Sequence, residues 1–250
     1  MKAKDQIHDA VREVNELRQL AHSQPTLLKA LSEVKQLQSR RFAGTYSDFL
    51  HKAPYRRAVE FFLSELYADK DYSQRDEQFS RISAGLEHFF PSPLLAAAVS
   101  LAQLHSLTER LDLAMAQLWL SDPATDEAVR YLRAWRLLNH RSDRLRQLMQ
   151  VMELGRLLEN ITHTPGLQLV LRMMRGPASL AGMGDLQKFL EAGFNTFHAM
   201  SESPDGAVFF LATIESRESH MITMLFDADT EICLAKIRRA LDPSGLIVGS

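Results

Sequence analysis

The sequence contains a single cysteine, Cys233, among its 250 residues. One thiol excludes an intrachain disulfide framework and a zinc site built mainly on thiolates. Long hydrophobic runs are also missing, because the most apolar stretches, 94–104 and 207–214, are shorter than the ~20 residues that cross a bilayer. The first six residues carry two lysines and an aspartate and lead into an amphipathic pattern, which is not that of a secretory signal. We therefore expect a cytoplasmic protein without a membrane segment.

The sequence also lacks a large excess of positive or negative charge. The formal net charge is -2 at pH 7, with 24% charged and 46% hydrophobic residues. This balance gives no overall attraction to nucleic acid or to an anionic membrane, so neither is expected as a partner. The hydrophobic content is that of an ordinary globular protein and argues against extensive disorder.

The common catalytic motifs are absent. The chain has no Gly-x-Ser-x-Gly elbow, no His-Glu-x-x-His and no Glu-x-x-His pairing of the di-iron type. Gly182 and Gly184 precede a predicted helix, but no strand comes before them and no Lys-Ser/Thr follows, which favours a turn over a phosphate-binding loop.

Nine histidines are present, and they form no metal-binding pattern. His105 is the most suggestive, because it is surrounded by apolar residues and has Glu109 four positions further on. A haem needs only one axial histidine, so His105 is a candidate haem ligand. The alternative is a histidine satisfied within the core, and no other cofactor or metal is predicted.

Apolar residues recur every three or four positions, and strand-like alternation is almost absent. This pattern predicts an all-α fold, a single multi-helix domain of about nine to eleven helices. Two long helices, at 93–120 and 123–160, begin after Ser92-Pro93 and Asp122-Pro123, each a capping residue followed by proline. We expect them to form an antiparallel spine. A loop is expected over 176–184.

The N-terminal residues form a possible separate unit. Two helices within 4–40 have narrow apolar stripes and broad polar faces, and Gly44 is expected to interrupt the pattern. We therefore divide the chain into an N-terminal helical hairpin, 1–40, and a main domain, 41–250. The hairpin is a candidate surface for homo-oligomerisation.

Aromatic residues are concentrated in one region. Four of the five tyrosines lie between Phe42 and Phe90, where a further helix is predicted at 74–90. Large aromatic side chains dominate core packing, so this region is expected to pack across the spine. An aromatic-lined ligand pocket is the alternative.

The same region carries a family resemblance. The residues concerned are Arg41-Phe42, Thr45-Tyr46, Asp48, Tyr55, the run from Phe61 to Tyr67 and Arg75-Asp76, followed later by the run from Phe189 to Phe194 and Arg217-Glu218. Over most of the chain this pattern resembles a bacterial protein family named for an FFLEELY motif. The sequence departs from that pattern at Ser64, where the motif has a glutamate, and at Ala68, where a glycine is common. The resemblance implies a helical fold and brings no catalytic residue.

Charged residues fall on apolar helical faces. Arg217, with Glu218 beside it, lies on one such stripe, Arg75 on another and Glu65 on a third. An isolated buried charge costs several kcal/mol, so these residues are expected to be paired, for example Glu65 with Arg217 or Arg75. Either they form structural ion pairs, or they form an internal polar site for an anion or carboxylate.

Basic residues fall on one face of the predicted helix 123–160. They are Arg130, Arg133, Arg136, His140 and Arg144. Arginine forks match carboxylates and phosphates, so this basic face is a candidate for binding a protein partner or an acidic ligand. The alternative is a solvated face whose charges are neutralised within the chain.

Three functions remain open from the sequence. The first is a non-enzymatic interaction protein that binds a partner through the basic face or the hairpin. The second is a small-ligand or haem-binding helical protein. The third is an enzyme acting on a phosphorylated or carboxylated substrate.

Overall fold

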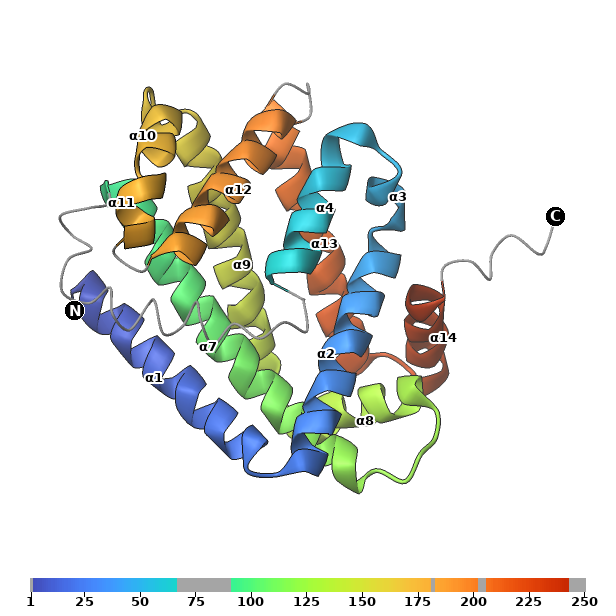
Figure 1. Cartoon of the computed structure of the whole chain (residues 1–250). Coiled ribbons are helices and arrows are strands. Elements are labelled where there is room, and N and C mark those ends of the chain that lie inside the picture. The colour runs from blue at the N-terminus through green and yellow to red at the C-terminus, as the bar shows by residue number, and fades with distance from the viewer. Residues whose placement is uncertain (1, 67–90, 181–182, 202–205, 243–250) are drawn as a thin grey trace.

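The computed structural model describes residues 2–66, 91–180, 183–201 and 206–242 (Figure 1). All regular structure in these residues is helical, which confirms the predicted all-α fold. The predicted helix at 74–90, with Arg75, lies outside the described residues. The helices are α1 (Ala3–His22), α2 (Pro25–Thr45), α3 (Ser47–Leu50), α4 (Ala53–Glu65), α7 (Ser92–Ser121), α8 (Glu127–Leu138), α9 (Arg141–Thr162), α10 (Leu167–Met173), α11 (Arg175–Leu180), α12 (Gly184–Ser201), α13 (Gly206–Asp227) and α14 (Thr230–Leu241).

Two long helices, α7 and α9, pack against each other through the middle of the molecule (Figure 1). They run antiparallel, because Thr108 of α7 contacts Gln147 of α9 while Met115, further along α7, contacts the earlier Arg144. The predicted spine is therefore confirmed. Proline in the first turn begins α7 as expected, since its missing N–H would have no partner there.

The second spine helix is shorter than predicted. Residues 123–160 do not form one helix, because α8 ends at Leu138 and α9 begins at Arg141. Asn139 lies between them in the left-handed conformation, with φ 51°, which asparagine adopts more readily than most residues. Asp126, rather than Asp122, caps α8, since its side chain accepts hydrogen bonds from two backbone N–H groups of the first turn.

Helices α1 and α2 form a V-shaped pair, and both pack on α7 (Figure 1). Polar contacts join α1 to α7, among them Gln103 Nε2 to Gln6 Oε1 at 2.9 Å and Arg110 Nη1 to Glu13 Oε1 at 3.2 Å. Residue 40 lies inside α2, which runs on to Thr45.

Gly44 was predicted to interrupt the helical pattern, but it lies inside α2, which continues to Thr45. A Cβ at this position would lie 1.8 Å from the carbonyl oxygen of Ala240, so glycine allows α14 to pack directly against the α2 backbone. The predicted loop at 176–184 was also too long, because Arg175–Leu180 form α11. Pro177 fits there, since proline is tolerated in the first turn of a helix.

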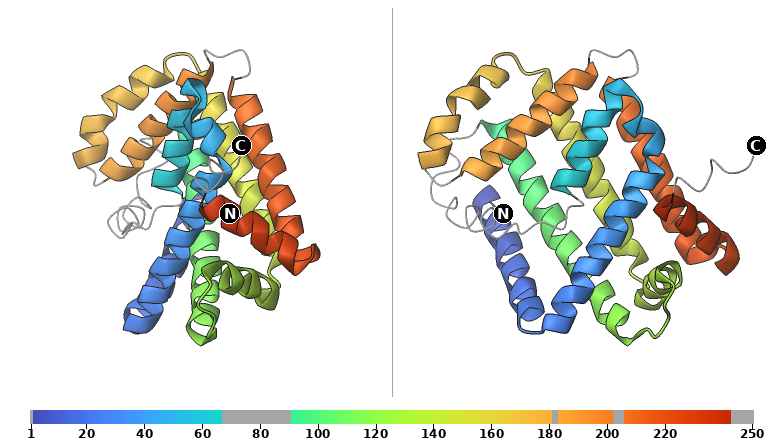
Figure 2. Two further views of the ribbon diagram at one scale, coloured as in Figure 1. Left: turned by 90° about the vertical axis from the view of Figure 1, so that its right-hand side faces the viewer. Right: turned by 45° about the vertical axis from the view of Figure 1, so that its right-hand side comes forward.

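Helices α10 and α11 lie at one end of the molecule and α14 at the opposite end (Figure 2). Aromatic side chains from α2, α3 and α4 pack in the core between these two ends of the molecule. Phe62 meets Phe210 of α13 with ring centroids 5.5 Å apart, and Phe61 meets Phe189 of α12 at 5.4 Å. The described part of the aromatic region thus belongs to the core, as the sequence indicated. None of the described helices combines the length and apolar character needed to cross a bilayer.

Candidate functional site

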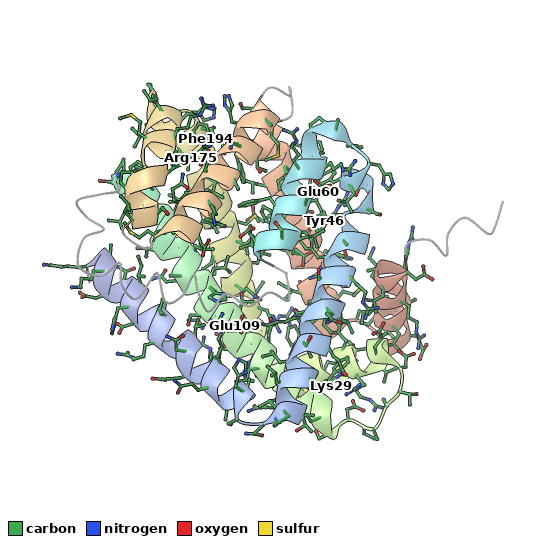
Figure 3. The ribbon with its side chains drawn as sticks, viewed as in Figure 1. Lys29, Tyr46, Glu60, Glu109, Arg175 and Phe194 are labelled. Atoms are coloured by element: carbon green, nitrogen blue, oxygen red, sulfur yellow. The ribbon has the colours of Figure 1, made fainter. Side chains whose placement is uncertain are left out.

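A cavity of about 70 Å³ lies between the helices that cross the spine, and we call it the central cavity. Helices α2, α4, α7, α8, α9 and α13 all contribute to its wall. Figure 3 shows Glu109, one of its residues, near the middle of the molecule. The wall combines apolar side chains with eight ionisable ones: Lys35, Arg41, Glu65, His105, Glu109, Asp112, Arg144 and Glu218.

Helix α7 contributes four polar side chains to the wall of the cavity. His105, Thr108, Glu109 and Asp112 are three or four positions apart, so they lie on one helical face. Both carboxylates are buried, with 5% of Glu109 and 4% of Asp112 exposed. A polar stripe of this kind inside an otherwise apolar helix requires partners on the neighbouring helices.

Lys35 of α2 is the partner of Glu109. Its Nζ donates to both carboxylate oxygens, at 2.7 and 2.9 Å. His105 lies beside this pair, with Nδ1 4.0 Å from Glu109 Oε1 and Nε2 3.4 Å from Nη2 of Arg18. The three helices α1, α2 and α7 are therefore joined by charged groups at this wall of the cavity.

Asp112 accepts a hydrogen bond from Gln38 Nε2 at 2.7 Å. Burial raises the pKa of the Asp112 carboxyl above its ordinary value, and the nearby charges of Arg144 and Lys35 act in the opposite direction. The raised pKa means that burial outweighs these charges, so the neutral, protonated form of Asp112 persists to higher pH than in an exposed aspartate.

Arg41 and Glu218 form the most deeply buried ion pair of the cavity. Arg41 Nη1 donates to both oxygens of Glu218, at 2.7 and 2.8 Å, and both residues are less than a tenth exposed. The hydroxyl of Tyr46 also donates to Glu218, at 3.1 Å. This pair connects α2 to α13 and leaves the Glu218 carboxylate well supplied with donors.

Arg144 of α9 stacks on the indole of Trp135, with its guanidinium carbon 4.7 Å from the ring centroid. Its Nη1 donates to Gln147 Oε1 at 3.0 Å, and Gln147 Nε2 in turn donates to Thr108 Oγ1 at 2.8 Å. The stacking and hydrogen bonds hold a planar, permanently charged group at the cavity wall.

Two further polar groups of α8 are buried and have only a poorly formed hydrogen bond, which they make with each other. They are the Tyr131 hydroxyl and the indole N–H of Trp135, whose residue borders the cavity. Burial raises the pKa of Tyr131, and the charges of Arg41 and Arg144 are near enough to lower it in part. The Trp135 indole N–H is the neighbour of the Tyr131 hydroxyl, and this contact also lowers the pKa of Tyr131 in part.

The structure brings together two of the four residues predicted for an internal site. Glu65, at the end of α4, and Glu218 both line the central cavity. Arg75 lies outside the described residues. Arg217 lies elsewhere, at the surface near α3, where Nη1 and Nη2 each donate to Asp48 at 2.8 Å.

The relative burial of Arg217 and Glu218 is the reverse of the sequence-based expectation. Glu218, placed at the edge of the apolar stripe, is buried, whereas the Arg217 side chain is 34% exposed. Hydrogen bonding from Arg217 lowers the pKa of Asp48 and raises that of Arg217 itself. This is a surface ion pair, distinct from the cavity.

The four arginines of the basic face are engaged within the chain. Arg144 lines the cavity, His140 precedes α9, and Arg133 contacts Asp122 at 3.2 Å. Arg136 donates to the carbonyls of Leu225 and Ala228 at the end of α13, and Arg130 stacks on Trp119 at 4.0 Å. Binding of a partner by this face stays a prediction.

His105 lies on the wall of the central cavity, whose volume is about 70 Å³. Its role as a haem ligand stays a prediction. Within the described residues, no group of three or more histidine, cysteine, aspartate or glutamate side chains could hold a metal ion.

Most residues of the cavity were not singled out from the sequence. Lys35, Arg41, Asp112 and Trp135 were missed, and Glu109 was noted only as a neighbour of His105. A signal was present for Arg41, which follows Val34 and Leu37 at helical spacing on the buried face of α2. Charged residues at core spacing on α2 and α7 are the pattern that could have revealed the site.

A family model described as a domain of unknown function (DUF8198) matches residues 17–232. Every residue that lines the central cavity falls within this range. Neither the curated proteins nor the solved structures give a match.

Proposed function

Because this chain belongs to the family of domains of unknown function DUF8198, its role has to be argued from its own side chains, and we propose that it binds a small polar molecule in the central cavity. The main support is the gathering of eight ionisable side chains around a hollow in the protein interior. Burial raises the pKa of one of them, Asp112, and a perturbed titratable group in a concave site is a physical indicator of function.

Stability alone does not account for this arrangement. Replacing buried ion pairs by well-packed apolar side chains is often neutral or stabilising. A core selected only for stability would also leave no hollow among its charged side chains. Proteins retain such features where a ligand has to be recognised.

The size of the cavity restricts the ligand to a small molecule. A volume of about 70 Å³ holds about five to seven water molecules at ~10–15 Å³ each. That space suits a metabolite with few non-hydrogen atoms and excludes a nucleotide.

The other sequence-based hypotheses have less support. Partner binding through the basic face would use arginines that already contact the chain, and an enzyme would require a reacting group for which no motif is present. The resemblance to the FFLEELY-motif family is a more specific hypothesis than membership of DUF8198. It implies no activity that would change the proposal.

Thermal denaturation of the full chain with a panel of small molecules tests the proposal. The panel comprises the standard amino acids, short carboxylic acids, short amines and inorganic phosphate. We expect at least one compound to raise the midpoint temperature in a saturable way, because a ligand that binds only the folded state stabilises it. A panel without any saturable shift would contradict the proposal.

Tryptophan fluorescence then locates the binding. Of the two tryptophans, Trp135 borders the cavity, while Trp119 packs under Arg130. In the Trp119→Phe variant, the active compound should change the emission of Trp135. In the Trp135→Phe variant, the emission of Trp119 should stay unchanged. The reverse result would place the compound outside the cavity.

A further inference from the structure

Two adjoining hollows lie beside α14, apart from the central cavity. The smaller, of about 330 Å³, lies where the end of α2 meets α13 and α14, and we call it the basic hollow. The larger, of about 680 Å³, lies between α13 and α14 near the turn that joins them, and we call it the apolar hollow. His220, Lys236 and Arg239 line both hollows and do not line the central cavity, so the two hollows form one continuous site.

The basic hollow has no acidic side chain in its wall. Four of its nine lining residues are basic, namely Arg217, His220, Lys236 and Arg239. The chain as a whole has a formal net charge of -2, so this part of the surface has the opposite sign to the protein. Arg217 is already bound to Asp48, which leaves Lys236 and Arg239 as the positive charges that the hollow offers to a ligand.

Lys236 and Arg239 have no partner in the part of the chain that the structure describes, where neither forms a hydrogen bond or an ion pair. Arg238 differs from them, because its Nη2 donates to Asp126 Oδ2 at 2.6 Å. Lys236 and Arg239 are three positions apart, so they are neighbours on one face of α14. Like charges at this spacing repel each other, and an anion between them would replace that repulsion with attraction.

The apolar hollow continues from these charges toward the turn between α13 and α14. Its apolar side chains are Met224, Ala228, Ile232 and Ala235. Ile232 is 60% exposed, and it lies about 10 Å along α14 from Arg239, at ~1.5 Å per residue. The hollow is also lined by Thr223 and by Asp227, whose two carboxylate oxygens accept from Arg141 at 2.8 and 2.6 Å. The one acidic group of this hollow is therefore neutralised within the chain.

From these two hollows we infer that this surface binds a small amphiphile with a phosphate monoester group. The phosphate lies between Lys236 and Arg239, and the aliphatic body lies against Ile232. A phosphate monoester carries a charge of about -1.5 to -2 at pH 7, which matches two positive side chains, whereas a carboxylate would neutralise only one. Arginine binds phosphate with a fork of N–H donors and lysine binds it as a point charge. No residue of the central cavity takes part, so the inference is independent of the proposed function.

Titration calorimetry with three matched compounds on the intact chain tests the inference. Hexyl phosphate has both the phosphate and the aliphatic body, heptanoate has a single negative charge, and inorganic phosphate has no aliphatic body. We expect hexyl phosphate to bind with one site per chain and at least about tenfold more tightly than either of the others, since each of them loses one half of the recognition.

Variants of α14 locate the binding. Lys236→Ala combined with Arg239→Ala should weaken the binding of hexyl phosphate at least about tenfold, because both charged partners of the phosphate are lost. Arg238→Ala is the matched control, since it removes an arginine of the same helix that is bound to Asp126, and it should leave the affinity unchanged. Ile232→Ser should weaken the binding of hexyl phosphate and leave that of inorganic phosphate unchanged. All four side chains are exposed, so these variants are expected to fold.

Vesicles of phosphatidylcholine with and without phosphatidic acid distinguish the source of the phosphate. Sedimentation with the vesicles that requires phosphatidic acid, and that the double variant loses, would identify the ligand as a lipid headgroup. Binding of hexyl phosphate without binding to vesicles would identify a soluble phosphate ester.

Three results would overturn the inference. The first is heptanoate or inorganic phosphate binding as tightly as hexyl phosphate. The second is an affinity for hexyl phosphate that the double variant retains or that Arg238→Ala reduces equally. The third is no binding of hexyl phosphate, which would leave a segment of a partner protein as the occupant of the two hollows.

Discussion

Two neighbouring residues of α13 take part in ion pairs of opposite character. Glu218 pairs with Arg41 at 2.7 Å inside the protein, where the side chains are 10% and 5% exposed. Arg217 pairs with Asp48 at 2.8 Å at the surface, where they are 34% and 44% exposed. The lengths of the two pairs are almost equal, so burial, rather than geometry, distinguishes them.

The comparison teaches what each pair contributes. Water screens the surface pair, so it adds little to stability and can be lost at small cost. The buried pair has given up its hydration, so either partner becomes very costly if the other is removed. Such a pair is weak evidence of selection for stability alone, which is consistent with the proposed ligand site.

The largest expected effect comes from breaking the buried pair. Arg41→Met leaves the Glu218 carboxylate buried without its main donor and should lower the free energy of unfolding by about 3–5 kcal/mol. Urea denaturation measures this loss. The double variant Arg41→Met with Glu218→Met is the control, and it should recover most of the stability. A single variant that loses less than about 1 kcal/mol would show that the pair is not desolvated.

Two buried tyrosines allow the removal of a single hydroxyl group to be compared where it has a good hydrogen bond and where it has a poor one. Tyr46→Phe removes a hydrogen bond to the Glu218 carboxylate and should cost about 1.5–3 kcal/mol. Tyr131→Phe removes a buried hydroxyl whose contact with Trp135 is a poor hydrogen bond, so it should change the free energy of unfolding by less than about 1 kcal/mol. Equal losses in both variants would contradict the structure at Tyr131.

Asp112 gives the cavity a characteristic pH dependence. Its pKa is raised in the folded state by burial, so the folded protein retains a proton that the unfolded chain releases. This group therefore contributes stability below the ordinary aspartate pKa, and the contribution is lost as the pH rises through the raised value. Asp112→Asn should remove this slope from denaturation measured between acid and neutral pH. An unchanged slope would assign the effect to another group.

The surface pair should show the smallest effect, with the opposite dependence on pH. Asp48→Asn should cost less than about 1 kcal/mol at neutral pH, and added salt should reduce that cost. The pKa of Asp48 is lowered in the folded state, so its contribution is present above the ordinary aspartate pKa and is lost as the pH falls through the lowered value. A cost comparable with that of Arg41→Met would remove the contrast between the pairs.

Much of the fold could be read from local sequence. The apolar spacing predicted the bounds of α7, α13 and α14 to within one residue, because each of these helices has a clear apolar stripe facing the core. The break between α8 and α9 depends on the left-handed Asn139, and a helical pattern continues across it without a visible gap. Similarly, Gly44 was read as a helix breaker, although its role is contact with α14.

The site was harder to predict, since its partners are remote in sequence. Arg41 and Glu218 are 177 positions apart, and Lys35 and Glu109 are 74 apart, so no local pattern could pair them. Assigning Arg217 rather than Glu218 to the core illustrates a second limit. Adjacent helical residues differ by about 100°, so a small error in the stripe exchanges their environments.

The central claim is that the polar groups of the cavity are kept for a ligand. Urea denaturation at neutral pH of the wild-type chain and of Asp112→Asn, each with and without the compound that gives the largest thermal shift, tests it most directly. Asp112 lines the cavity and burial disfavours its charged form, so we predict that the variant is at least as stable without the compound and gains less stability from it than the wild type does. A variant that is less stable without the compound, and that gains as much from it, would contradict the account.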